Sequence, residues 1–166
     1  MIGLLTVATA YLRGFFFVRI FQILHHLFQS GHLHGTWSWI AIRNAEIRGI
    51  VDLEGGLDPS KIRKHLDWYH YWHIWDGAIS GINLKELWYT AHLIKEKIDS
   101  GMNVLVHCQG GVNRASLVNG CVLYLQGLRG TRIIDHIRKR RPHALTNSDF
   151  VRYLSSLVRD GMDIIQ

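Results

Sequence analysis

Apolar residues in the second half of the chain recur at spacings that predict helices and strands. Over residues 83–100 they return every three or four positions, which predicts an amphipathic helix. Asn83 stands where an N-terminal cap belongs, and Gly101 stands where a glycine commonly ends a helix. The apolar run 104–106 then predicts a short buried strand, and helical spacing returns over residues 114–126.

The same reasoning extends to the remaining segments. We expect further helices over residues 38–49, 59–66 and 131–141, the last capped by Thr131, and a final helix capped by Asn147. An apolar strand is expected over residues 50–53, and an aromatic strand over 68–75. Because strands and helices alternate, we predict an α/β fold, with a central, mostly parallel sheet flanked by helices.

The first 35 residues read as an apolar N-terminal extension, followed by one domain over residues 36–166. Arg19, Gln22, His26 and Gln29 fall on one helical stripe, so residues 1–28 suit an amphipathic helix in peripheral contact with a membrane. The alternative is a helix or strand packed on the core of the domain. The uncharged run 1–12 is shorter than the roughly 20 residues that cross a bilayer.

Composition narrows the class of protein. A chain of 166 residues with 48% hydrophobic residues forms a single folded domain, which excludes general disorder. The net charge of +6 favours anionic partners, namely phosphate groups, nucleic acid or a membrane surface. The only two cysteines, Cys108 and Cys121, exclude a disulfide framework and suit a reducing compartment. We therefore expect a cytoplasmic protein, with or without membrane association.

The segment VLVHCQGGVNRAS, residues 104–116, carries the clearest chemistry. A strand ends at His107, Cys108 follows, and a loop with two glycines leads to Arg114 at the start of a helix. Glycines allow backbone N–H groups to converge on one anion, and the N-terminus of a helix adds positive charge. Arg114 supplies a planar pair of donors for two phosphate oxygens. A cysteine thiol in this position favours the thiolate form. The alternative is a buried core cysteine beside a chance glycine turn.

These residues resemble the Cys-X5-Arg signature of cysteine-based protein phosphatases, and most closely that of the dual-specificity branch. The resemblance implies that Cys108 attacks phosphorus to form a phosphocysteine, and that Arg114 binds substrate and stabilises the transition state. His107 would tune the thiolate. No metal or cofactor is implied. The phosphoryl oxygens would be bound by the loop residues Gln109, Gly110, Gly111, Val112, Asn113 and Arg114.

The resemblance also implies a general acid, which protonates the leaving oxygen. Asp76 lies 32 residues before Cys108, as in dual-specificity phosphatases, and its alternative is a solvated turn residue. Downstream, the run IRKRRPHALTNSDF resembles the same family. It makes Arg141 the candidate for a second phosphate contact and Asn147 a supporting residue. The similarity covers residues 47–157.

Two departures keep alternatives open. Active members commonly have Ser or Thr after the signature arginine, where this chain has Ala115, followed by Ser116 on another face of the helix. We therefore expect slow hydrolysis of the phosphocysteine, and a pseudophosphatase that only binds phosphoproteins is one alternative. The pair Asn113-Arg114 also resembles RNA 5′-phosphatases of the capping-enzyme type, so RNA is an alternative partner.

The prediction is thus a protein phosphatase for phosphotyrosine, phosphoserine or phosphothreonine, with a phosphorylated protein as substrate. Its oligomeric state stays open. The histidine pairs His32 and His34, and His70 and His73, lack further ligands at zinc spacing, so we predict no metal site. Cys121 is expected in the core, the alternative being a partner that resolves oxidised Cys108 as a disulfide.

Overall fold

The computed structural model describes residues 19–33, 35–55 and 64–158, which fold around a five-stranded sheet. The order of the strands is β1-β2-β5-β3-β4; β1 pairs antiparallel with β2, and every other neighbouring pair is parallel. This confirms the predicted mostly parallel sheet. The strands are β1 (Ile20–Leu24), β2 (Leu27–Ser30), β3 (Ile47–Asp52), β4 (Trp68–Tyr71) and β5 (Asn103–His107).

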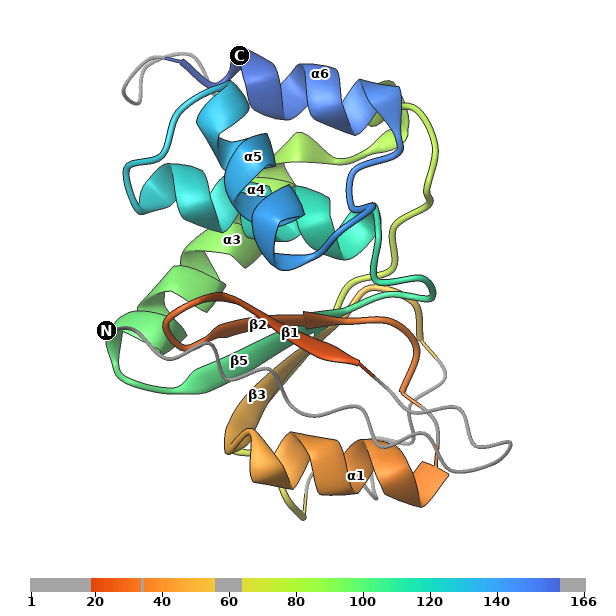
Figure 1. The fold of residues 1–166 in the computed structure, drawn as a ribbon, viewed down its shortest axis with the longest axis vertical. Coiled ribbons are helices and arrows are strands. Elements are labelled where there is room, and N and C mark those ends of the chain that lie inside the picture. Colours follow the sequence, from red (N-terminus) through yellow and green to blue (C-terminus); the bar gives the residue numbers. More distant parts are fainter. Residues whose placement is uncertain (1–18, 34, 56–63, 159–166) are drawn as a thin grey trace.

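Helices cover both faces of this sheet. In Figure 1, α1 lies on one face, and α3, α4, α5 and α6 lie on the other. The predicted α/β class is therefore confirmed. The helices are α1 (Gly35–Asn44), α3 (Leu84–Asp99), α4 (Arg114–Leu125), α5 (Thr131–Arg140) and α6 (Ser148–Ser156), and a 3-10 turn spans Ile79–Gly81.

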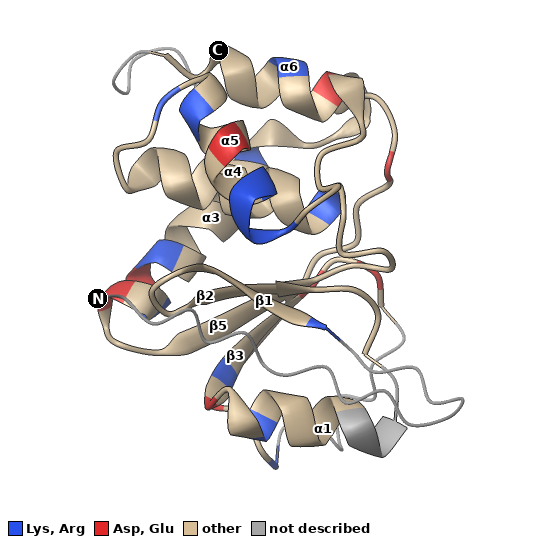
Figure 2. Ribbon diagram, viewed as in Figure 1, with Lys and Arg blue, Asp and Glu red and all other residues tan. Residues whose placement is uncertain are grey.

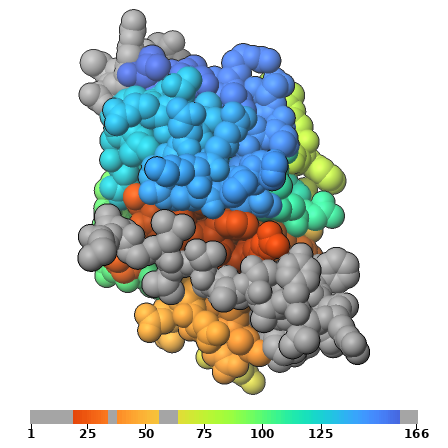
Figure 3. Space-filling view, in the orientation of Figure 1, coloured from red at the N-terminus to blue at the C-terminus, as the bar shows by residue number. Residues whose placement is uncertain are grey.

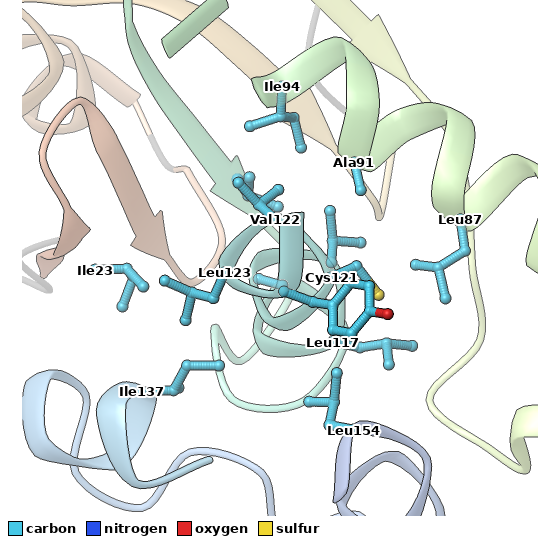
Figure 4. Packing of buried hydrophobic residues seen from close by; sticks show 14 of the residues in the cluster. Ile23, Leu87, Ala91, Ile94, Leu117, Cys121, Val122, Leu123, Ile137 and Leu154 are labelled. Atoms are coloured by element: carbon cyan, nitrogen blue, oxygen red, sulfur yellow. The ribbon is translucent and has the colours of Figure 1, made fainter. Parts of the chain in front are cut away.

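Helix α4 is the centre of the larger core. Every residue from Arg114 to Tyr124 is buried, because α4 is enclosed between the sheet and the neighbouring helices. Figure 4 shows side chains of α3, α5 and α6 directed at this helix, around Leu117 and Cys121. A Cβ on Gly120 would lie 2.6 Å from a Leu154 methyl group, so the absence of a side chain lets α6 approach. Cys121 is fully buried in the core, as expected, and burial raises the pKa of its thiol.

Two predicted helix caps are confirmed. Asn83 accepts hydrogen bonds from the backbone N–H groups of Lys85 (3.1 Å) and Glu86 (3.3 Å). Asn147 does the same for Asp149 (3.0 Å) and Phe150 (3.3 Å) at the start of α6. These bonds satisfy donors that the first turn of a helix leaves unpaired.

Other boundaries were predicted wrongly. The expected helix over residues 38–49 ends at Asn44, because a turn with left-handed Glu46 (φ 52°) follows and Ile47 already begins β3. Thr131 is the first residue of α5 rather than its cap, which is Gly130 without a side-chain bond. The aromatic strand ends at Tyr71, four residues early. Most of the helix expected over residues 59–66 lies outside the described residues.

Of the two interpretations of the N-terminal segment, the amphipathic helix is wrong over residues 20–30, and the strand packed on the domain describes them. Residues 20–30 form a β1–β2 hairpin, with left-handed His26 (φ 64°) at its turn. Strand β2 pairs with β5 from Leu27–Val104 to Ser30–His107, so the hairpin is part of the same sheet as the later strands. In Figure 3 the hairpin lies directly against α5, and His136 bonds the carbonyl of Ile23 at 2.8 Å. Among the described residues, no helix has the length and apolarity to cross a membrane.

Candidate active site

The segment from Cys108 to Arg114 forms a tight loop at the carboxyl end of β5. Gly111 has φ +58°, and a Cβ there would lie 2.4 Å from the backbone nitrogen of Gly31. Only glycine fits that contact. The loop is also tied to the end of β2, since His32 donates its backbone N–H to the Gln109 carbonyl at 2.9 Å. Cys108 is 2% exposed at the base of this loop.

Arg114 is held in place with part of its guanidinium left for a ligand. Its Nη1 donates to the carbonyls of Leu53 (3.4 Å) and Ile74 (3.2 Å), which fixes the side chain beside the loop. Its Nε is buried and has no hydrogen-bond partner. A buried, unpaired and charged donor is costly, so this atom is suited to a bound oxyanion.

Asp76 lies against the same loop. Its two carboxylate oxygens accept hydrogen bonds from the side-chain amides of Asn113 and Asn147, each at 2.9 Å. The Oδ1 atom of Asn113 in turn accepts from the backbone N–H of Asn147 at 3.0 Å. Three segments that are distant in sequence therefore meet, and the predicted acid lies beside the predicted nucleophile loop. Asn147 has a double task, because its Oδ1 caps α6 while its Nδ2 holds Asp76.

His107 lies beneath the loop beside a carboxylate that the sequence analysis missed. Its Nε2 is 3.3 Å from Asp52 Oδ1, a close contact that leaves both ring nitrogens without a hydrogen bond. Burial lowers the pKa of His107 to about 4, and the negative charge of Asp52, which raises the pKa, offsets only part of that effect. Asp52 accepts hydrogen bonds from the Tyr69 hydroxyl (2.9 Å) and the backbone of Glu54 (2.9 Å) and Gly55 (2.8 Å). At neutral pH the residue before Cys108 is thus a neutral imidazole facing a buried carboxylate that accepts three hydrogen bonds from the protein.

Gln29, on β2, is a second residue that the sequence analysis did not place at the site. Its Nε2 donates to the Gly111 carbonyl (3.0 Å) and to Ser116 Oγ (2.7 Å), and its Oε1 accepts from Asn119 Nδ2 (3.0 Å). Gln29, Ser116 and Asn119 are fully buried. The network joins β2, the loop and α4. The hydroxyl of Ser116, predicted as a supporting group, is therefore buried and bonded to Gln29 beneath the loop.

Arg141 contacts the outside of the loop. Its Nε donates to the Gly111 carbonyl at 3.1 Å and its Nη2 to the Gly110 carbonyl at 3.4 Å. The guanidinium also lies 4.6 Å from the centre of the Phe21 ring. It follows the basic last turn of α5, whose Lys and Arg residues Figure 2 shows in blue. In this structure the hydrogen bonds of Arg141 therefore stabilise the loop.

The remaining predicted loop residues differ in exposure. Gln109 and Gly110 are exposed, whereas Val112 is half-buried and its carbonyl accepts from the backbone of Leu145 at 3.0 Å. Within the described ranges, no group of three or more His, Cys, Asp or Glu side chains is arranged to hold a metal ion. His32 instead contacts Glu54, with Nδ1 2.6 Å from Oε2.

Comparison with known proteins now gives the family. The model of the dual specificity phosphatase catalytic domain matches residues 68–160, more than half of the chain. The chain belongs to the dual-specificity phosphatase family. It is therefore a phosphatase enzyme that acts on phosphorylated substrates, and its sheet and flanking helices are those of the family's fold.

Solved structures of dual-specificity phosphatases and related enzymes share this fold at low identity. Tk-PTP in its active form has a TM-score of 0.67 and 19% identity, over 83% of this chain and 95% of that chain. Human DUSP28 has a TM-score of 0.67 and 17% identity, over 81% and 89%. PTPMT1 in complex with PI(5)P has a TM-score of 0.69 and 14% identity, over 82% and 92%. No curated protein sequence matches significantly.

Proposed function

We propose that this dual-specificity phosphatase hydrolyses phosphotyrosine, phosphoserine or phosphothreonine in proteins through a phosphocysteine at Cys108. The observation that carries the proposal is the bond from Asn113 to Asp76, which joins a carboxylate to the loop between Cys108 and Arg114. This contact supports the proposal because it brings the residues proposed as nucleophile, oxyanion partner and proton donor to one loop.

The first chemical step transfers the phosphoryl group to sulfur. The Cys108 thiolate attacks phosphorus, the bond from phosphorus to the leaving oxygen breaks, and protonated Asp76 gives its proton to that oxygen. The loop N–H groups and the free Nε of Arg114 stabilise the charge on the transferring oxygens. Because these residues supply every role, the proposed reaction proceeds without a metal.

The second step hydrolyses the phosphocysteine. Asp76, now a carboxylate, takes a proton from water as the water oxygen attacks phosphorus, and the bond from phosphorus to sulfur breaks. Inorganic phosphate and the thiolate result. Ala115 lacks the hydroxyl that family members use to assist the departing thiolate, so we expect this step to limit turnover. If it is slow enough, the protein is a binder of phosphoproteins.

The other candidate substrates are less well supported. The likeness to RNA 5′-phosphatases rests on Asn113. The side-chain amide of Asn113 is engaged by hydrogen bonds with Asp76 and with the backbone of Asn147, so it is not left open for RNA. The PTPMT1 structure contains PI(5)P, but at 14% identity the similarity shows a shared fold and not a shared substrate. The cytoplasmic location and the membrane contact of residues 1–28 stay predictions.

The test compares substrates at one active site. Phosphate release is measured with EDTA present from phosphopeptides, from PI(5)P in vesicles and from 5′-phosphorylated RNA. We expect release from phosphopeptides, its loss in Cys108→Ser and a reduction in Asp76→Asn. Faster release from RNA or lipid than from any phosphopeptide would contradict the proposed substrate class. Unchanged activity in Cys108→Ser would contradict the mechanism.

A further inference from the structure

Trp75 is the most exposed large hydrophobic residue that the structure describes, with 79% of its surface accessible. An indole gains more than most side chains from burial, so an accessible indole next to a ligand-binding loop can contribute to binding. Its one described ring contact is with His73, edge to face, at 4.8 Å between centroids. Most of the indole surface therefore remains accessible to a ligand.

The position of Trp75 is fixed by bonds on both sides. The carbonyl of the preceding residue, Ile74, accepts from Arg114 Nη1 at 3.2 Å. The carboxylate of the following residue, Asp76, is held by Asn113 at 2.9 Å. Neighbouring Cα atoms are about 3.8 Å apart, so Trp75 stands between the contacts to the phosphate-binding arginine and to the acid.

The chemistry of the acid decides which part of a substrate comes near this indole. Asp76 must come within about 2.6–3.2 Å of the leaving oxygen to protonate it. The group bonded to that oxygen is then close to Asp76 and its neighbour Trp75. In phosphotyrosine that group is an aromatic ring, which can lie against the indole. In phosphoserine and phosphothreonine it is an aliphatic carbon, and in a nucleoside 5′-phosphate a ribose separates the base from the phosphate.

Resting on the proposed function, we infer that Trp75 forms a subsite for an aromatic leaving group and makes this site selective for phosphotyrosine over phosphoserine and phosphothreonine. Such a contact is made equally in the bound substrate and in the transition state, so its loss raises KM and leaves kcat unchanged. Aromatic stacking corresponds to roughly a 3- to 10-fold change in affinity.

The first experiment measures binding, without turnover. In the Cys108→Ser background, calorimetry compares phenyl phosphate with inorganic phosphate for the parent and for added Trp75→Ala, Trp75→Phe and Tyr89→Ala. Tyr89 is a matched control, since it is an aromatic residue of α3 with 56% exposure. We expect Trp75→Ala to weaken phenyl phosphate about 3- to 10-fold and leave inorganic phosphate unchanged. Trp75→Phe should retain most of the affinity, and Tyr89→Ala all of it.

The second experiment measures turnover of one peptide carrying phosphotyrosine or phosphothreonine. We expect Trp75→Ala to raise KM for the first peptide alone. An equal loss of phenyl phosphate and inorganic phosphate would overturn the inference, because Trp75 would then be structural. A lower kcat with unchanged KM would overturn it as well, since Trp75 would then position Asp76. Tighter binding of adenosine 5′-monophosphate than of phenyl phosphate would assign the indole to a base.

The two proposals fail in different ways. If the wild type hydrolyses no phosphopeptide, yet phenyl phosphate binds in a Trp75-dependent manner, the subsite stands and the proposed function fails. If phosphopeptides are hydrolysed without preference for phosphotyrosine, the proposed function stands and the subsite fails.

Discussion

Replacing Gln29 by leucine removes the centre of the buried network under the phosphate loop. Asn119 Nδ2 and Ser116 Oγ then lose their partner, while the Gly111 carbonyl keeps its bond from Arg141. Each buried polar group left unpaired costs about 1–3 kcal/mol. We therefore expect a loss of about 3 kcal/mol in the free energy of unfolding, which lowers Tm by roughly 6–12 °C in a chain of this length.

Urea denaturation of wild type and variant measures this difference, and the matched control is Gln22→Leu, an exposed glutamine on the adjacent strand β1. Adding Asn119→Leu to Gln29→Leu removes an orphaned amide, so the double variant should recover part of the loss. Because the loop depends on the network, the variant should also release phosphate more slowly than wild type at urea concentrations too low to unfold either protein. A Gln29→Leu protein within about 0.5 kcal/mol of wild type would refute the reasoning.

Three further predictions concern the acid, the phosphocysteine and the response to pH. Asn147→Ser keeps a helix cap but loses the hydrogen bond to Asp76, so it should lower kcat several-fold at nearly wild-type Tm. Asn147→Ala also loses the cap and should in addition lower the free energy of unfolding by about 1 kcal/mol. Equal stability of the two variants would contradict the conclusion that Asn147 both caps α6 and holds Asp76. Ala115→Ser should raise steady-state turnover and shrink the pre-steady-state burst in rapid-mixing experiments, and an unchanged burst would show that breakdown is not limiting. Because the pKa of His107 is about 4 in the native state against 6.5 for a free histidine, the unfolded chain binds the proton first and stability falls as pH drops from 6.5 towards 4. His107→Asn should flatten that fall in denaturation curves, and exposed His92→Asn should not; parallel curves for all three proteins would contradict the buried neutral imidazole.

Most of the site that the sequence predicted is encoded within one short segment, and the rest follows from the family resemblance. Cys108, the loop glycines and Arg114 are neighbours in the chain, so their spacing alone indicates a phosphate loop. Asp76 was found through a family spacing. The structure places it at the loop, although its role in proton transfer stays a proposal.

The parts that were missed depend on contacts between distant segments. Gln29 meets Ser116 across 87 positions, and nothing near Gln29 in the sequence marks it as a loop partner. Asp52 closes an apolar strand, and only the parallel pairing of β3 with β5 places it opposite His107. For the N-terminal segment the sequence left a helix and a packed strand open, because its polar residues also fit a helical stripe. Only its pairing with β5 decides between the two.

The most direct test of the account is to trap the covalent intermediate. Wild type is mixed with p-nitrophenyl phosphate in EDTA, quenched in acid within milliseconds and digested for mass spectrometry, with Cys108→Ser treated in parallel. We predict one phosphoryl group on the peptide that contains Cys108, at high occupancy because Ala115 leaves hydrolysis slow, and none on the Cys108→Ser peptide. Phosphate release from wild type without any phosphoryl group on Cys108, or release that persists in Cys108→Ser, would contradict the central claim.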